Sequence, residues 1–256
     1  MCSSARCELP AKHTFMSKKT TFFSIVLTII VATFIASEIL TKDMESKATI
    51  PSQSRLLTEL AAEDEEWIIS SYDAVMRRIG EEEGQDWLLM SAIAYNESRF
   101  RSDLTSKRGA IGLMQIMPIV GRQFNVEKEA IADPETNIRL AGKLLRQIDK
   151  MLKLSPTTPA NDRISIILAC YNGGIGHVSD ARRLAKSNGE DPNSWEVVAR
   201  YLKAKADPEV YESELVRHGK FTGSGQTEAY VREVMKRYDI YRNLVENGAD
   251  MVAQVK

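Results

Sequence analysis

One acidic residue, Glu97, stands at the end of an apolar run within residues 91–118, which read SAIAYNESRFRSDLTSKRGAIGLMQIMP. A carboxyl group beside apolar residues is poorly solvated, which disfavours its charged form and raises its pKa. A general acid that works at neutral pH needs this property. We therefore take Glu97 as a candidate proton donor. Its position alone also allows a surface glutamate at a helix end.

A glycine-led turn follows the acid. Gly109 and Gly112 flank this turn, and we expect the next residues, LMQIMP, to form a short apolar helix. Glycines permit positive φ and a close approach of the backbone. Gln115 is polar within this apolar run, and a buried amide must find partners. Gln115 is therefore expected either to brace the turn or to face a cleft.

A second polar pair, Tyr171-Asn172, precedes three glycines in four positions, Gly173, Gly174 and Gly176. One glycine is ordinary at a helix end, but three leave a bare backbone that is open to a ligand. The tyrosine and the asparagine could stack on a sugar and hydrogen-bond to it. The alternative is a glycine-rich turn beside a core tyrosine.

Tyr230 falls on the apolar stripe of the last expected helix, a position typical of a core residue. A buried phenol still needs a hydrogen-bond partner. A carboxyl group such as that of Glu97 would serve.

The elements that must position these side chains are helices. Apolar residues recur every three or four positions, with no long alternation typical of strands, and this pattern predicts an all-α domain. Asp86 and Asp133-Pro134 are start signals, Gly80 and Gly84 are expected to break the first helix, and residues 211–225 are expected to form a polar, mobile loop. The helices are expected at residues 68–79, 87–97, 134–152, 163–171, 177–186, 195–205 and 226–246.

An apolar stretch precedes the domain. Residues 20–37 carry no charge, and 22–36 read FFSIVLTIIVATFIA. This length lies between a cleaved signal peptide and a spanning helix, and we favour an uncleaved anchor with the amino terminus in the cytoplasm and the bulk of the chain outside it. The expected organisation is a basic tail at 1–19 (Met1 or Met16 being the start), a signal-anchor or signal peptide at 20–40, a tether at 41–62, a catalytic domain at 63–248 and a tail at 249–256.

Composition narrows the function classes. The net charge of −1 gives no argument for nucleic acid. The three histidines are scattered and the three cysteines form no CxxC pair, so we predict neither a metal site nor a cofactor. Cys170 is expected to be a small buried hydrophobe.

Taken together, these motifs resemble those of the soluble-type (family 1) lytic murein transglycosylases, above all the catalytic module of the membrane-bound lytic transglycosylase F type. The resemblance rests on Glu97-Ser98-x-Phe100, Ser106-x-x-Gly109-Ala110-x-Gly112-Leu113-Met114-Gln115-x-Met117-Pro118, Asn137-Ile138, Tyr171-Asn172-Gly173-Gly174-x-Gly176 and Tyr230-Val231.

This resemblance implies a lysozyme-like helical fold with a groove for peptidoglycan glycan strands. It makes Glu97 the catalytic acid, and it assigns substrate-binding or supporting roles to Ser106, Met114, Gln115, Tyr171, Asn172 and Tyr230. The implied reaction cleaves the bond between N-acetylmuramic acid and N-acetylglucosamine and closes a 1,6-anhydro ring.

Two alternatives stay open. Glycoside hydrolysis usually employs two carboxylates, and Asp103 is the other acid in residues 91–118, where we expect it to be solvated at the surface. A lysozyme-type hydrolase on the same fold is the first alternative. A non-catalytic peptidoglycan-binding protein is the second.

Overall fold

A computed structural model describes residues 69–255 of the chain, with side chains to residue 247. The described residues lie within a compact unit, Trp67–Lys256. The tail, the apolar segment and the tether expected at residues 1–62 lie outside the described residues. Among residues 69–255, no helix combines the length and apolar composition that a membrane crossing requires.

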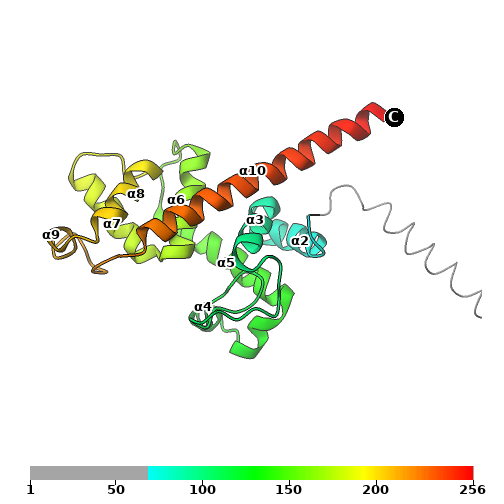
Figure 1. Cartoon of the computed structure of the whole chain (residues 1–256), viewed down its shortest axis with the longest axis horizontal. Coiled ribbons are helices and arrows are strands. Elements are labelled where there is room, and N and C mark those ends of the chain that lie inside the picture. The colour runs from blue at the N-terminus through cyan, green and yellow to red at the C-terminus, as the bar shows by residue number, and fades with distance from the viewer. Residues whose placement is uncertain (1–68, 256) are drawn as a thin grey trace, which may run out of the picture. The chain divides into compact units, whose positions relative to one another are not determined.

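The described part of the chain is helical, as the apolar periodicity predicts, and its extended pairing is limited to two isolated bridges. In chain order (Figure 1), the elements are α2 (Asp73–Glu83), α3 (Trp87–Ser98), α4 (Pro118–Gln123), the 3-10 helix η1 (Lys128–Ala132), α5 (Pro134–Leu152), α6 (Ala160–Gly173), α7 (Ile175–Ser187), α8 (Trp195–Ala204), α9 (Pro208–Tyr211) and α10 (Ser224–Val255).

The expected start signals are confirmed. The Asp86 carboxylate accepts a 2.8 Å hydrogen bond from the Leu88 amide and so caps α3. Asp133 accepts from the Thr136 amide at 2.9 Å, and Pro134 occupies the first turn of α5. These caps satisfy amides that the helices themselves leave without partners.

Gly80 does not break the first helix, contrary to expectation, and α2 continues through it to Glu83. A Cβ at Gly80 would lie 2.8 Å from the Gln85 carbonyl oxygen, so glycine permits a close approach of the backbone here. Gly84 does end the helix, with φ +65°, a conformation that glycine adopts without strain.

The residues after Gly112 are not helical, which corrects a second expectation. Ile111 and Ile116 exchange two backbone hydrogen bonds of 3.0 and 2.9 Å, and a bridge from Thr105 to Ile111 continues the pairing. Gln115 has φ +48°, which a right-handed helix does not permit. The apolar run is therefore a closed loop, and helix α4 begins only at Pro118.

The core gathers around α3, whose residues 88–94 are all buried. Helix α10 packs along α3 and α6, while α2 packs on α3 and α5. Helices α6, α7 and α8 form a second group of neighbours, and Figure 1 shows α10 running past both groups. Cys170 is 3% exposed within this core, as expected. The end of α3, which carries Glu97, thus has helices on several sides.

Candidate active site

A groove of about 460 Å³ opens beside Glu97. Five parts of the chain form it: the end of α3, the loop before α4, the end of α6, the segment before α10 and the first turn of α10. The lining residues are Glu97, Ser106, Arg108, Ala110, Gln115, Met117, Tyr171, Asn172, Gly173, Phe221, Gly223, Gln226 and Thr227. The groove is within the size range of small-ligand sites.

Glu97 is the next-to-last residue of α3 and is mostly shielded from solvent. Burial disfavours the carboxylate and raises the pKa of Glu97 from 4.5 to about 7, against the opposing effect of the Tyr230 hydroxyl. At neutral pH the group is therefore close to half protonated. It can donate a proton and accept one back within the same pH range.

The Tyr230 side chain lies beside this carboxyl group. Burial, followed by the nearby Glu97, raises the pKa of Tyr230 far above its ordinary value, so the phenol keeps its proton. Its hydroxyl is buried and makes no hydrogen bond of regular geometry with any described residue. The contact with Glu97 is therefore loose, as catalytic contacts often are before substrate binds.

Tyr171 brings the end of α6 against the loop before α4. Its hydroxyl donates a 2.7 Å hydrogen bond to the backbone carbonyl of Met114. Burial, and then the neighbouring Glu97, raises the pKa of Tyr171 well above its usual value. The tyrosine is also a lining residue of the groove, so one side chain both supports the loop and contributes to the groove wall.

Met114 is not a groove residue, which corrects its assignment to substrate binding. Its side chain is fully buried in the core. Its carbonyl receives Tyr171, and its amide donates a 2.7 Å hydrogen bond to Asn137 Oδ1. The apolar side chain of Met114 packs into the core, and the residue contributes to the site only through the hydrogen bonds of its backbone.

Gln115 both braces the turn and lines the groove, so the two alternatives are compatible. Its Nε2 donates to the carbonyls of Gly112 at 2.9 Å and Leu104 at 3.2 Å. Both amide protons are thereby used, and what Gln115 can offer a ligand is its Oε1 acceptor. Ser106 also closes its own turn, since its Oγ accepts a 2.9 Å hydrogen bond from the Ala110 amide.

Asn172 is held by the last helix. The Thr227 hydroxyl donates a 3.0 Å hydrogen bond to Asn172 Oδ1. With Oδ1 engaged, the Asn172 NH₂ group is the part of the amide that can donate to a ligand. Asn172 and Gln115 thus supply a donor and an acceptor to one groove.

Asn137, on α5, holds the groove loop from behind and was not assigned a role from the sequence. It is fully buried and donates through Nδ2 to the carbonyls of Ile111 and Ile131, at 2.9 Å each. A Cβ at Gly112 would lie 2.7 Å from this amide. Gly112 is thus required both by its φ of +76° and by Asn137.

The segment before α10 forms part of the groove wall, although residues 211–225 were expected to be a polar, mobile loop. Phe221 is 9% exposed and lines the groove, and its amide donates to the Lys205 carbonyl at 3.1 Å. Sequence reasoning missed Phe221 and Thr227, because neither belongs to a local motif. The signal available was an aromatic residue within residues 212–225, where most of the other residues are polar or glycine.

A buried ion pair fixes this segment to the domain. The Lys205 ammonium lies 2.7 Å from Asp180 Oδ2, and both side chains are 0% exposed. Asp180 also accepts from the backbone amides of Arg217 at 3.1 Å and His218 at 2.9 Å. Burial acts to raise the pKa of Asp180, but hydrogen bonds from Lys205, His218 and these amides outweigh it and hold the pKa well below its usual range.

Among the described residues that line the groove, Glu97 alone carries a carboxyl group. Asp103 is exposed and is not part of the lining, in agreement with the sequence prediction. In the described part of the chain, no cluster of His, Cys, Asp or Glu is placed to hold a metal ion. The arrangement therefore supplies one proton donor, two amides and aromatic rings.

The sequence comparisons with known proteins agree on one family. Residues 74–194 match the family model of the Transglycosylase SLT domain. The chain is 36% identical over 169 residues to the membrane-bound lytic murein transglycosylase F of Stutzerimonas stutzeri, and 32% identical over 178 residues to that of Marinobacter nauticus. These alignments cover 66% and 70% of this chain but 33% and 34% of the relatives, so the chain spans about a third of their length. Among solved structures, lytic transglycosylase Slt from Pseudomonas aeruginosa aligns with 70% of this chain and 25% of its own, at 24% identity and a TM-score of 0.47.

Proposed function

We propose that the chain is a peptidoglycan lytic transglycosylase, because residues 74–194 match the family model of the Transglycosylase SLT domain. It cleaves the β-1,4 bond between N-acetylmuramic acid and N-acetylglucosamine and leaves a 1,6-anhydromuramic end. The observation that carries the proposal is Glu97, a lone groove carboxyl group whose pKa of about 7 suits it to proton transfer in both directions.

The first step is acid catalysis. Protonated Glu97 donates its proton to the glycosidic oxygen, and N-acetylglucosamine leaves as an alcohol. Positive charge develops at the anomeric carbon of the muramic acid, where the substrate's own 2-acetamido oxygen stabilises it. The second step is base catalysis, in which the Glu97 carboxylate removes the proton from the muramic 6-hydroxyl and that oxygen bonds to the anomeric carbon. No water is consumed, and Glu97 ends protonated as it began.

The groove amides suit an N-acetylated sugar. An acetamido group has one N–H donor and one carbonyl acceptor. The Gln115 Oε1 can accept and the Asn172 NH₂ can donate, because their other amide atoms are engaged within the protein. The Phe221 and Tyr171 rings add apolar surface for the face of a sugar ring. This donor and acceptor set supports a substrate with 2-acetamido groups.

The single carboxyl group favours ring closure over hydrolysis. Inverting hydrolases place a second carboxylate roughly 6.5–9.5 Å from the acid, and retaining ones place it about 5–5.5 Å away. Among the described residues, the groove lining offers no such partner for Glu97. An internal nucleophile, the 6-hydroxyl, removes the need for one.

The test is digestion of purified sacculi followed by mass spectrometry of the muropeptides. We expect anhydro-terminated products from the wild-type chain and none from Glu97→Gln, with Asp103→Asn as a matched control that stays active. Reducing ends in place of anhydro ends would show hydrolysis. A Glu97→Gln chain that still cuts would exclude Glu97 as the acid. A wild-type chain that binds sacculi without cutting them would indicate a non-catalytic binding protein.

We also propose that the enzyme works in the cell envelope, anchored through residues 20–40. The support is the uncharged apolar stretch together with the membrane-bound relatives. Fractionation tests the anchor. We expect the chain to stay with membranes after an alkaline carbonate wash, and release into the wash would overturn the anchor while leaving the activity untouched.

A further inference from the structure

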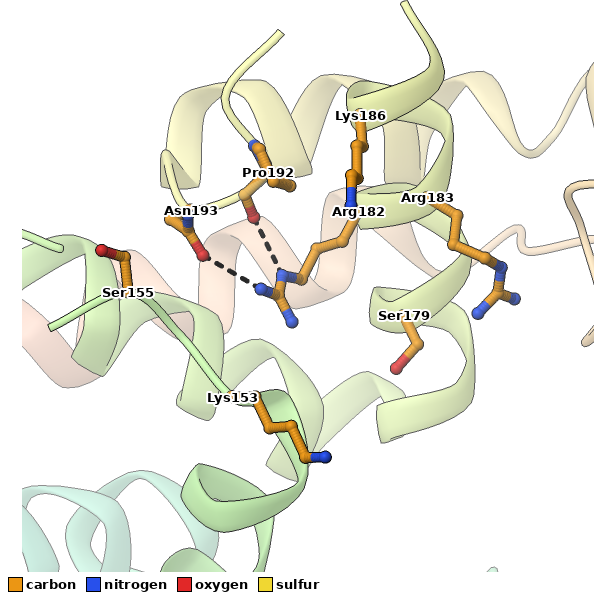
Figure 2. A pocket seen from close by; sticks show the side chains of 8 residues that line it. All are labelled: Lys153, Ser155, Ser179, Arg182, Arg183, Lys186, Pro192 and Asn193. Carbon is orange, nitrogen blue, oxygen red and sulfur yellow. Dashed lines mark hydrogen bonds between the residues drawn. The ribbon is translucent and has the colours of Figure 1, made fainter. Parts of the chain in front are cut away.

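A second pocket of about 520 Å³ lies away from the groove and shares no lining residue with it. The end of α5, helix α7 and the segment before α8 surround it (Figure 2). Its lining residues are Lys153, Ser155, Ser179, Arg182, Arg183, Lys186, Pro192 and Asn193. Figure 2 shows Lys153, Ser179 and Arg182 directed toward one shared space.

Every ionisable side chain in this lining is cationic. The chain as a whole has a net charge of −1, so this concentration of positive charge is local rather than a result of a basic composition. Cations gathered without carboxylates repel one another, and an anion placed among them relieves that repulsion. The serine hydroxyls are additional hydrogen-bond donors.

Arg182 is the fixed member of the set. It is partly buried and donates to the carbonyls of Pro192 at 2.9 Å and Leu152 at 2.6 Å and to Asn193 Oδ1 at 3.0 Å. All three acceptors are uncharged, so the guanidinium is held in place while its charge is not neutralised by them. Three of its five N–H groups are used, which leaves two for a ligand.

The acids Asp180 and Asp191 lie near the pocket but outside its lining. Asp191 acts on Arg182 from a distance, while its own carboxylate accepts a 2.9 Å hydrogen bond from the Asn193 amide. Arg183 forms an ion pair with the buried Asp180, which also pairs with Lys205, so the charge of Arg183 is partly balanced. Arg182, Lys153 and Lys186 are therefore the cations of the lining that have no carboxylate partner and can bind an anion.

The two lysines of the lining come from different elements. Lys153 is the left-handed C-cap of α5, at φ +47°, and Lys186 follows Arg182 by one turn of α7. Neither forms an ion pair with another side chain in the described part of the chain. A purely structural role, in which Arg182 holds the neighbouring segments together through its hydrogen bonds, would explain Arg182 alone. It would not explain why two further cations and no acid share the lining.

We propose that this pocket binds a phosphate group. Its donors are guanidinium, ammonium and hydroxyl groups, the set that recognises phosphate oxygens, and phosphate monoesters and diesters alike present several such oxygens and a negative charge. The ligand is either free phosphate, including a small phosphomonoester, or the phosphodiester headgroup of a lipid. This site does not depend on the proposed glycan cleavage, and its test reads binding alone.

Isothermal titration calorimetry of the full chain tests the site. Inorganic phosphate is one probe, and glycerophosphoglycerol, a water-soluble phosphodiester headgroup, is the other. We expect saturable binding at one site and a weakening of at least about tenfold in the double variant Lys153→Gln/Lys186→Gln, the size expected for one or two lost charge-assisted hydrogen bonds. Tighter binding of inorganic phosphate identifies the free anion as the ligand, and tighter binding of the diester identifies the headgroup.

The matched control is Lys128→Gln/Lys236→Gln, which removes the same charge from exposed lysines outside the pocket. It should bind both probes like the wild type. Equal weakening in the two double variants would show diffuse surface attraction and overturn the proposal. So would the absence of saturable binding of either probe by the wild-type chain. Both double variants keep Arg182 and its hydrogen bonds, so loss of the fold does not confuse the result.

Discussion

The Thr227 hydroxyl donates a 3.0 Å hydrogen bond to Oδ1 of Asn172, and both residues line the groove. This contact joins the first turn of α10 to the end of α6. It decides which half of the Asn172 amide is available to a ligand. The last helix of the domain therefore orients a binding group that belongs to another helix.

Replacing Thr227 by valine keeps the side-chain volume and removes this hydrogen bond. We expect KM for glycan fragments to rise about three- to tenfold, as for the loss of one hydrogen bond, while kcat changes little because Glu97 is untouched. Thr227→Ser retains the hydroxyl and should behave like the wild type. Steady-state kinetics measures the split, and an unchanged KM in Thr227→Val would contradict the role given to this contact.

The pKa of Glu97 sets the alkaline limit of activity. The protonated acid is the active form, so kcat/KM should fall about tenfold per pH unit above pH 7. The Tyr230 hydroxyl lowers the pKa of Glu97, so in Tyr230→Phe the fall of kcat/KM on the alkaline side should begin at higher pH, and kcat should be lower. A pH–rate profile of both proteins is the measurement. If kcat/KM falls over the same pH range in Tyr230→Phe as in the wild type, the phenol does not affect the pKa of Glu97.

Glu97 also links stability to pH. Its folded-state pKa is raised from 4.5 to about 7, so the folded chain holds the proton more tightly than the unfolded chain. The stabilising effect is complete below pH 4.5 and is lost as pH rises through 7. The free energy of unfolding of the wild type, relative to Glu97→Gln, should therefore fall by on the order of 3 kcal/mol between pH 4 and pH 8.

Urea unfolding of both proteins at the two pH values measures this difference. Asp103→Asn is the control, since Asp103 is exposed. A constant difference between wild type and Glu97→Gln across this range would mean that burial does not perturb the acid.

The buried pair of Asp180 and Lys205 supports the segment that carries Phe221. Asp180→Asn leaves the Lys205 ammonium buried without a carboxylate, which should lower the free energy of unfolding by about 3–5 kcal/mol. The double variant Asp180→Asn/Lys205→Met removes the stranded charge and should recover part of this loss. Urea unfolding of the single variants Asp180→Asn and Lys205→Met and of the double variant provides the coupling energy. Additive effects would show that the two groups do not act as a pair.

Local patterns in the sequence determined much of this protein. Asp86 and Asp133 marked helix starts because a cap acts on amides two or three residues away. The apolar run before Glu97 predicted its desolvation, because the acid shares a helix with the residues that bury it. Local patterns failed where a neighbour outside the pattern intervened. Gly80 was predicted to end the first helix, but the helix continues and glycine is needed there because the Gln85 carbonyl lies close to it.

Only the tertiary structure decided how the groove is assembled. The hydrogen bonds from Tyr171 to Met114 and from Thr227 to Asn172 join positions 57 and 55 residues apart. Periodicity reports on neighbours within a turn or two and carries no information about such separations. The same limit explains why Met114 was assigned to the ligand and Phe221 was not. Which side of a closed loop meets the core, and which meets the groove, depends on the helices that pack against it.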